Sequence, residues 1–154
     1  MYDIIFCSLP YSDLDHVYSA PAILKGVVID HGFTAKTIDF GCELFKQFDR
    51  DITKFNNTQI YFISPDDNSS TKEDIERFYE NCITFFKNNP SKYIGISVLS
   101  ISTQRAVFEL CSRIRASEIT SKIVIGGCGA KVNFYSNVAN HFNLTAVEKL
   151  ISFV

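Results

Sequence analysis

Apolar residues along this chain alternate between two arrangements, short continuous runs and longer stretches with helical spacing. Short runs bounded by loop residues are typical of buried strands, and apolar residues three and four positions apart are typical of helices that cover a sheet. Their alternation indicates an α/β domain with a mostly parallel sheet. We predict strands at 3–8, 33–40, 93–98, 122–125 and 150–154.

The stretches with helical spacing predict the helices that cover this sheet. The first should begin at Ser19, carry an apolar stripe that includes Ile23, and end at Gly32. The most regular spacing falls within 70–86. Segment 59–64 remains open between a short extra strand and an apolar strip that covers the core. Further helices are expected over 44–55, with a stop at 56–58, and over 103–114 and 132–142.

Composition narrows the class of protein. The 154 residues are one domain in length, and 46% of them are hydrophobic, which is enough for a core without disulfides. A net charge of −2 gives no electrostatic case for nucleic acid. No apolar run reaches the length of a membrane span, and no signal peptide is seen. The five cysteines form no C-x-x-C pair, which argues against zinc and favours reduced thiols in a cytoplasmic protein.

The segment 92–130 forms the centre of the predicted site. It contains two short apolar runs joined by one amphipathic stretch, the pattern of a parallel strand–helix–strand crossover. Ligands of open parallel sheets bind at the carboxyl ends of the strands. Hydroxyl groups and glycines, which offer donors and little bulk, gather at these two ends. The candidates for ligand contact there are Ser97, Ser100, Gly126, Gly127 and Gly129.

Four stretches of the chain carry a family likeness. They contain the sequences LP followed by APAILKG, GFT through IDF, YIGISV followed by a hydroxyl-rich turn, and IVIGGCGA. In this order and spacing they resemble the cobalamin-binding domain found at the N-terminus of many radical-SAM enzymes. The long helical insertion between the second and third strands is also similar to that family.

The resemblance implies a doubly wound, mostly parallel, Rossmann-like or flavodoxin-like sheet of about five strands. It implies that residues 1–154 are a single cobalamin-binding domain, the N-terminal part of a longer protein. Leu9, Pro10 and Leu99 would pack on the corrin face, and Ser97 and Ser100 would donate to the nucleotide tail or to propionamide oxygens. The three glycines would let that tail lie against the backbone.

Two departures from related families shape the expected function. The D-x-H-x-x-G motif, whose histidine binds cobalt in the classical module, is absent around His16, His31 and His141. This agrees with the radical-SAM branch, which commonly binds the cofactor with its base detached. The C-x-x-x-C-x-x-C motif of radical-SAM chemistry is also absent. An iron–sulfur cluster and S-adenosylmethionine are therefore expected only in a C-terminal domain, and no catalytic or metal-ligating residue is assigned here.

The resemblance thus predicts a cofactor-holding module for a parent enzyme, often a methyltransferase, with a radical-SAM barrel as partner in cis or in trans. The alternative is a cofactor-free flavodoxin-like regulatory or interaction module. A receiver domain would need an aspartate at the end of the third strand, where 97–100 has none. A nucleotide-binding enzyme is disfavoured because 8–11 holds no glycine-rich phosphate loop.

Overall fold

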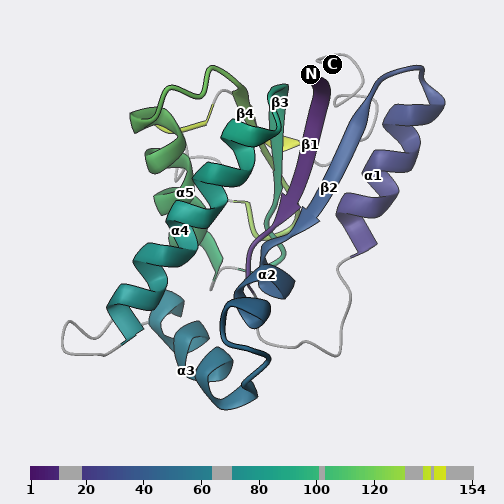
Figure 1. Ribbon diagram of the computed structural model, residues 1–154. Helices are drawn as coiled ribbons and strands as arrows, with labels where there is room; N and C mark the ends of the chain where they lie inside the picture. The colour runs from purple at the N-terminus through teal and green to yellow at the C-terminus, as the bar shows by residue number, and fades with distance from the viewer. Residues whose placement is uncertain (11–18, 64–70, 101–102, 131–136, 140, 145–154) are drawn as a thin grey trace.

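The computed structural model of the chain describes residues 1–10, 19–63, 71–100, 103–130, 137–139 and 141–144. Strands and helices alternate along most of this part of the chain, as the sequence predicts (Figure 1). In order, the elements are β1 (Tyr2–Ser8), α1 (Ser19–Asp30), β2 (Ala35–Asp39), α2 (Phe40–Gln47), α3 (Ile52–Ile63), α4 (Thr71–Asn88), β3 (Ser91–Ser97), α5 (Gln104–Ala116), β4 (Lys122–Gly126) and β5 (His141–Leu144).

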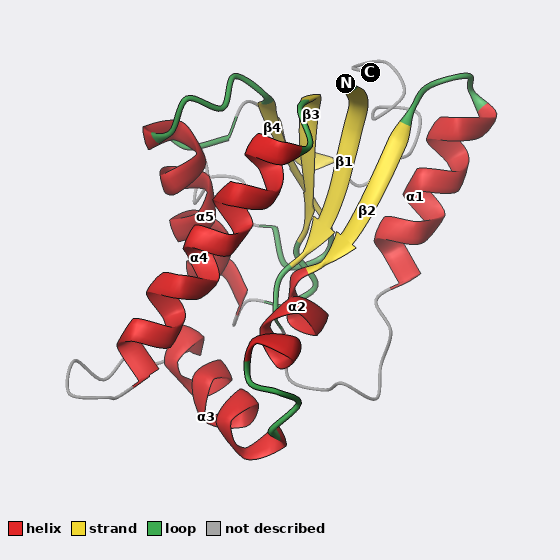
Figure 2. Cartoon of the chain, in the orientation of Figure 1, coloured by secondary structure: helices red, strands yellow, loops and turns green. Residues whose placement is uncertain are grey.

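The strands form one parallel sheet in the order β2-β1-β3-β4, and the short β5 extends it beside β4 with an irregular register. Helix α1 lies on one face and α4 and α5 lie on the other, so the sheet is covered from both sides (Figure 2). The α/β class and the parallel order are confirmed for these strands. The fifth predicted strand, 150–154, lies outside the described residues.

The alternation of side chains across β1 explains why its sequence reads as one continuous apolar run. Ile5 and Cys7 enter a large core cluster beneath α4 and α5, whereas Ile4 and Phe6 enter a small cluster beneath α1. Successive residues of a strand point to opposite faces, and here both faces are covered by helices. A Cβ on Gly95 would lie 2.7 Å from Cδ1 of Phe6, so the Phe6 ring lies over β3 where a side chain is missing.

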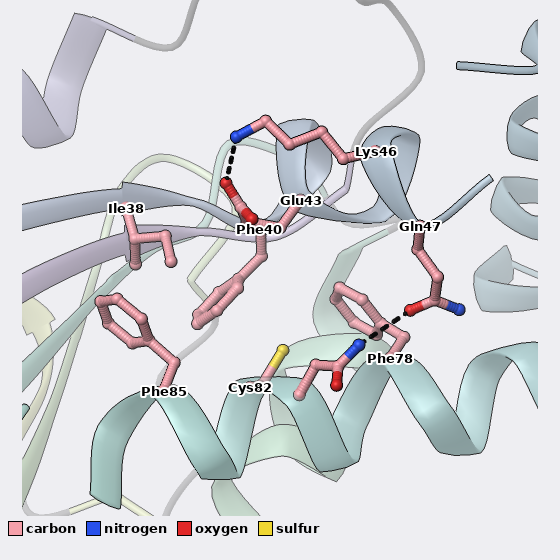
Figure 3. A pocket seen from close by; sticks show the side chains of 9 residues that line it. Ile38, Phe40, Glu43, Lys46, Gln47, Phe78, Cys82 and Phe85 are labelled. Atoms are coloured by element: carbon pink, nitrogen blue, oxygen red, sulfur yellow. Dashed lines mark hydrogen bonds and ion pairs between the residues drawn. The ribbon is translucent and has the colours of Figure 1, made fainter. Parts of the chain in front are cut away.

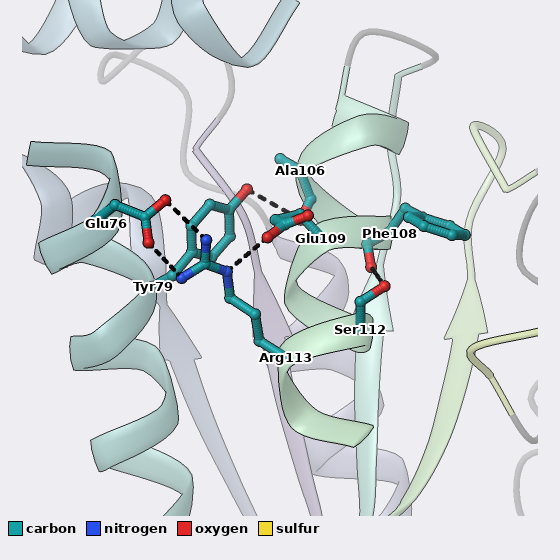
Figure 4. A network of polar contacts seen from close by, with 7 residues as sticks. All are labelled: Glu76, Tyr79, Ala106, Phe108, Glu109, Ser112 and Arg113. Carbon is teal, nitrogen blue, oxygen red and sulfur yellow. Dashed lines mark hydrogen bonds and ion pairs between the residues drawn. The ribbon is translucent and has the colours of Figure 1, made fainter. Parts of the chain in front are cut away.

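Helices α4 and α5 confirm the helical spacing read from the sequence. On α4 the buried residues include Ile75, Phe78 and Cys82, and on α5 the predicted face is fully buried. Between the two helices, the Arg113 guanidinium lies 4.6 Å above the Tyr79 ring and pairs with Glu76 and Glu109, with N–O distances of 2.7–2.9 Å (Figure 4). This contact lowers the pKa of the Glu76 carboxyl and fixes α5 against α4.

In the region 40–63 the start and the number of the helices differ from the predictions. The Asp39 carboxylate accepts hydrogen bonds from the backbone amides of Gly41 and Cys42, so α2 begins directly after β2 rather than at residue 44. The helical conformation then ends, because Asp49 and Arg50 both have positive φ. One helix predicted over 44–55 is therefore two.

Helix α3 then runs through the predicted stop at 56–58. Asp51 accepts hydrogen bonds from the amides of Thr53 and Lys54 and so caps α3, and Thr58 bonds back to the Lys54 carbonyl inside the helix. The strand alternative for 59–64 is wrong for its described part. Phe62 is buried in the main core, as expected of a covering strip, but Ile60 is 60% exposed.

Three smaller differences concern element ends and faces. His141 and Phe142 belong to β5, so the helix predicted over 132–142 is wrong at its end, where backbone pairing with β4 decides the conformation. Ile23, predicted to face the core from α1, is 61% exposed because Val28 and Leu24 supply the contact with the sheet. None of the helices in the described ranges is long and apolar enough to cross a membrane.

Asp3 ties three strands together at their amino ends. Its carboxylate accepts hydrogen bonds from the amide and hydroxyl of Thr34, which precedes β2, and pairs with Lys92 of β3 at 2.7 Å. The Lys92 ammonium first, and Thr34 second, hold the pKa of the Asp3 carboxyl well below its usual value of 3.8. The native state therefore binds a proton on Asp3 less readily than the unfolded chain does.

We expect Asp3→Asn to lower the melting temperature at pH 7 by about 3 °C, because it removes charge-assisted hydrogen bonds. The wild-type advantage is complete above the unfolded pKa and is lost as the pH falls through the lowered native pKa. Melting curves between pH 7 and pH 2 check this. The difference between the two proteins should begin to shrink below about pH 4 and should continue to shrink toward pH 2, and a constant difference down to pH 2 would contradict the role of Asp3.

Candidate functional site

The carboxyl edge of the sheet carries a row of polar or small residues on the face that α1 covers. Strand register places Ser8 beside Asp39 on one side and beside Ser97 on the other, and Ser97 beside Gly126. Two residues further in, the same register places Thr37, Phe6, Gly95 and Val124 side by side, and Phe6 and Val124 pack beneath α1. We call Asp39, Ser8, Ser97 and Gly126 the edge row. On β1 and β4 this row comes directly after the last large packing side chains of the face, Phe6 and Val124.

The loops after β3 and β4 are joined directly to each other beside this row. The Val98 amide donates to the Gly126 carbonyl at 2.8 Å, and the Gly129 amide donates to the Val98 carbonyl at 2.9 Å. The Cys128 thiol donates to the Leu99 carbonyl at 2.9 Å. The two loops therefore form one unit, and a ligand at the strand ends would contact both of them together.

Two of the predicted glycines have a reason to be glycine within this loop unit. Gly127 has a φ of +108°, and a Cβ there would collide with the Val98 carbonyl oxygen. A Cβ on Gly129 would lie 2.8 Å from the backbone nitrogen of Ser100. Both positions therefore require glycine for the approach of one loop to the other. The prediction that they also admit a ligand remains a prediction.

Gln104, the first residue of α5, is a site residue that sequence reasoning missed. Its buried side chain donates to the Gly129 carbonyl at 2.5 Å and so connects α5 to the loop after β4. Thr103, which directly precedes α5, makes no side-chain cap to the helix, and its hydroxyl donates to the Ser100 carbonyl instead. No motif marks a glutamine with this role, because the contact depends on the folded path of the distant 126–129 loop.

The remaining predicted contact residues differ in how accessible they are. Leu99 is 48% exposed and stands beside the joined loops. Ser97 and Ser100 are half-buried at the end of β3. Pro10 is buried, and Leu9 is 4% exposed and belongs to the main core cluster. Of the three apolar residues expected to meet a corrin, Leu99 is thus the one that presents its side chain.

Ser8 is a second edge residue that the sequence did not single out. It is 2% exposed, and its hydroxyl has no hydrogen-bond partner. Among the residues that the structure describes, only Gln59 on α3 shares this condition. Buried hydroxyls nearly always have partners, so this one requires an explanation.

Among the described residues, three of the five thiols are buried and His31 lies away from this edge. Burial raises the pKa of the Cys7, Cys82 and Cys111 thiols, which keeps them protonated and unreactive, whereas Cys42 and Cys128 are exposed. His31 lies in the connection from α1 to the start of β2, at the amino end of the parallel strands, and its ring donates to the Val27 carbonyl. No group of three potential metal ligands occurs within the described ranges.

A separate hollow of about 340 Å³ lies between α2 and α4. Figure 3 shows the rings of Phe40, Phe78 and Phe85 turned toward it, with the Glu43–Lys46 ion pair at its outer side. Phe40 and Phe78 belong to the main core cluster, on the sheet face opposite Ser8. This hollow is therefore distinct from the edge row.

No protein-family model and no curated protein sequence matches this chain. Among solved structures, it is similar to a novel cobalamin-binding protein from Desulfitobacterium hafniense DCB-2, with a TM-score of 0.57 and 13% identity over 97% of this chain and 55% of that one. It also matches TsrM, a radical S-adenosylmethionine methyltransferase from Kitasatospora setae with cobalamin and a [4Fe-4S] cluster bound, with a TM-score of 0.42, 18% identity, and coverage of 84% and 20%. The chain spans about half the length of the first protein, and that likeness establishes the fold.

Proposed function

We propose that this domain binds cobalamin at the carboxyl ends of β1, β3 and β4. The observation that carries the proposal is the edge row, where Ser8 follows the packed Phe6 on β1 and Gly126 follows the packed Val124 on β4, on a fold shared with a cobalamin-binding protein. In parallel α/β sheets this edge is the usual place for ligands. The exposed Leu99 and the unpartnered Ser8 are the features expected of a surface that a ligand completes.

The residues present are compatible with a corrin in this position. Leu99 would pack on the ring, and Ser97, Ser100 and the joined loops at Gly126, Gly127 and Gly129 would support its polar periphery and nucleotide tail. Pro10 borders the same edge, and Leu9 supports it from the core. Cobalamin supplies the cobalt–carbon chemistry, and the protein contributes binding and orientation. The proposal assigns no protein ligand to cobalt, because the sequence lacks the D-x-H-x-x-G motif whose histidine binds cobalt.

We further propose that the domain is the cofactor-holding part of a longer radical-SAM enzyme, with methyl transfer as its reaction. The order of the four sequence stretches supports this assignment. The iron–sulfur cluster and S-adenosylmethionine would then belong to a barrel domain in the same chain or in a partner chain. A C-x-x-x-C-x-x-C motif in the coding sequence beyond residue 154 would support a barrel in the same chain. If that motif is absent, co-purification with a protein that carries it would support a barrel in a partner chain. If neither the motif nor such a co-purifying protein is found, the radical-SAM proposal is contradicted.

The binding proposal predicts that the purified chain retains hydroxocobalamin through desalting, with a visible spectrum of the form whose base is detached from cobalt. We expect Leu99→Ala to weaken binding about fivefold, because it removes roughly half of a leucine side chain's worth of apolar contact. Ile60→Ala on α3 is the matched control, since it also truncates an exposed apolar side chain and lies in a different part of the fold. Spectroscopic titration gives the three dissociation constants.

Each of three outcomes would contradict one part of the binding proposal. A folded wild-type chain that retains no cobalamin favours the cofactor-free interaction module instead. Equal affinity of the wild type and Leu99→Ala would remove Leu99 from the binding surface. A spectrum with the base still on cobalt would contradict the base-detached mode while leaving binding in place.

A further inference from the structure

The buried polar side chains of the described residues show how unusual Ser8 is. At the opposite end of the sheet, Ser91 is also buried, but its hydroxyl donates to the Tyr93 carbonyl at 2.9 Å. Ser121 beside it donates to the Ser91 carbonyl. The fold thus satisfies the buried hydroxyls at the amino edge of the sheet and leaves Ser8, at the carboxyl edge, without a partner. An unpartnered buried hydroxyl costs stability, so a partner supplied by a ligand would explain its presence.

The direction of the Ser8 side chain follows from the alternation in β1. Cys7 and Leu9 enter the core beneath α4 and α5, so Ser8 points to the face that α1 covers, as Phe6 does. Ser97 lies on the same face of the neighbouring strand, about 4.8 Å away. Two hydroxyl donors are therefore placed side by side at the edge where the proposed ligand binds.

The charge in the edge row limits what the partner of Ser8 can be. Asp39 occupies the register position beside Ser8 on β2. One oxygen of its carboxylate already accepts from Gly41 and Cys42, and a carboxylate has further lone pairs. A negative charge this close disfavours a phosphate oxygen. A primary carboxamide suits the row, because its carbonyl oxygen accepts from a serine hydroxyl while its N–H donates to a carboxylate.

We propose that the Ser8 hydroxyl donates a hydrogen bond to a carboxamide side chain of the bound corrin, with Asp39 accepting from the same amide. This inference rests on the proposed function. Ser8 would then be a specificity residue for corrins that carry amides. Its hydroxyl would lack a partner, and so would cost stability, only in the ligand-free protein. The nucleotide tail and its phosphate are not the partner of Ser8.

The test compares Ser8→Ala with the matched control Ser91→Ala, using hydroxocobalamin and cobinamide, a corrin that keeps the amides but lacks the nucleotide tail. Ser8→Ala should raise the melting temperature of the ligand-free protein by about 3 °C and weaken binding of both corrins about three- to tenfold. Ser91→Ala should lower the melting temperature and leave both affinities unchanged. A substitution that raises the melting temperature and weakens binding is expected only for a hydroxyl whose hydrogen-bond partner is the ligand.

The possible results separate this inference from the function on which it rests. Wild-type protein that binds neither corrin overturns both. Wild-type binding with unchanged affinity in Ser8→Ala overturns the role of Ser8 and leaves the function standing. A loss confined to hydroxocobalamin, or no wild-type binding of cobinamide, overturns the amide assignment, because the contact would then depend on the tail. A lowered melting temperature in ligand-free Ser8→Ala contradicts the unpartnered state.

Discussion

Gly127→Ala is expected to lower the free energy of unfolding by about 4 kcal/mol and to abolish retention of cobalamin. The new Cβ meets the Val98 carbonyl oxygen, and the backbone at φ +108° is one that side chains rarely adopt. Relief requires the loops after β3 and β4 to separate, which breaks the hydrogen bonds between Val98 and both Gly126 and Gly129. Urea denaturation and the desalting assay measure the two effects.

Gly26→Ala is the matched control for this substitution. Gly26 lies in the middle of α1, and apart from its chain neighbours and the backbone of its own helix a Cβ there would meet no atom within 4 Å. Replacing it should stabilise the protein by about 0.5–1 kcal/mol, because alanine is the better helix former, and cobalamin binding should not change. Equal stability of Gly127→Ala and the wild type would show that the two loops are not held together in the way described.

Phe78→Ala should also lower the free energy of unfolding by about 4 kcal/mol and the melting temperature by roughly 10 °C. The ring is 2% exposed and packs edge-on or tilted against Phe40, Phe62 and Tyr79, with centroid distances of 5.3–6.3 Å. These neighbours come from α2, α3 and α4, so one truncation leaves a cavity where three helices meet. Thermal melts and denaturant titrations measure the loss.

Phe78→Leu serves as its control, because it keeps most of the volume and should cost less than about 1.5 kcal/mol. The affinity of the folded Phe78→Ala fraction for cobalamin should stay within about twofold of the wild type, since additivity holds for distant sites. A loss of affinity as large as that of Leu99→Ala would mean that the edge row depends on the packing of α2 and α3. Similar stability of the alanine and leucine variants would contradict a tightly packed cluster.

The sequence predicts most of the fold because apolar spacing is strong where burial is complete. The apolar spacing fits a helix and not a strand on α4 and on α5, where Val107, Leu110 and Ile114 are fully buried. The region 40–63 is harder because its boundaries depend on local hydrogen bonds. Asp39 starts a helix at once after a strand, and positive φ at Asp49 and Arg50 breaks it without glycine or proline.

The site is less predictable than the fold, because its contacts depend on which residues of different strands and loops lie beside one another. Position in the sequence identifies strand ends, so Ser97 and Gly126 were foreseeable. The isolation of the Ser8 hydroxyl and the bond from Gln104 to Gly129 depend on which distant residues lie beside them. Glycines suggest close approach, but at Gly127 and Gly129 the approaching group is the chain's own backbone.

The Phe6 ring over Gly95 has a consequence for how this domain can change in evolution. Because the two residues share one volume across β1 and β3, the side chains allowed at position 95 depend on the size of residue 6. An alanine or valine at 95 is tolerated only together with a smaller residue at 6. Homologous domains should therefore show covariation at these two positions, large with small and small with large, and each substitution alone should be rare.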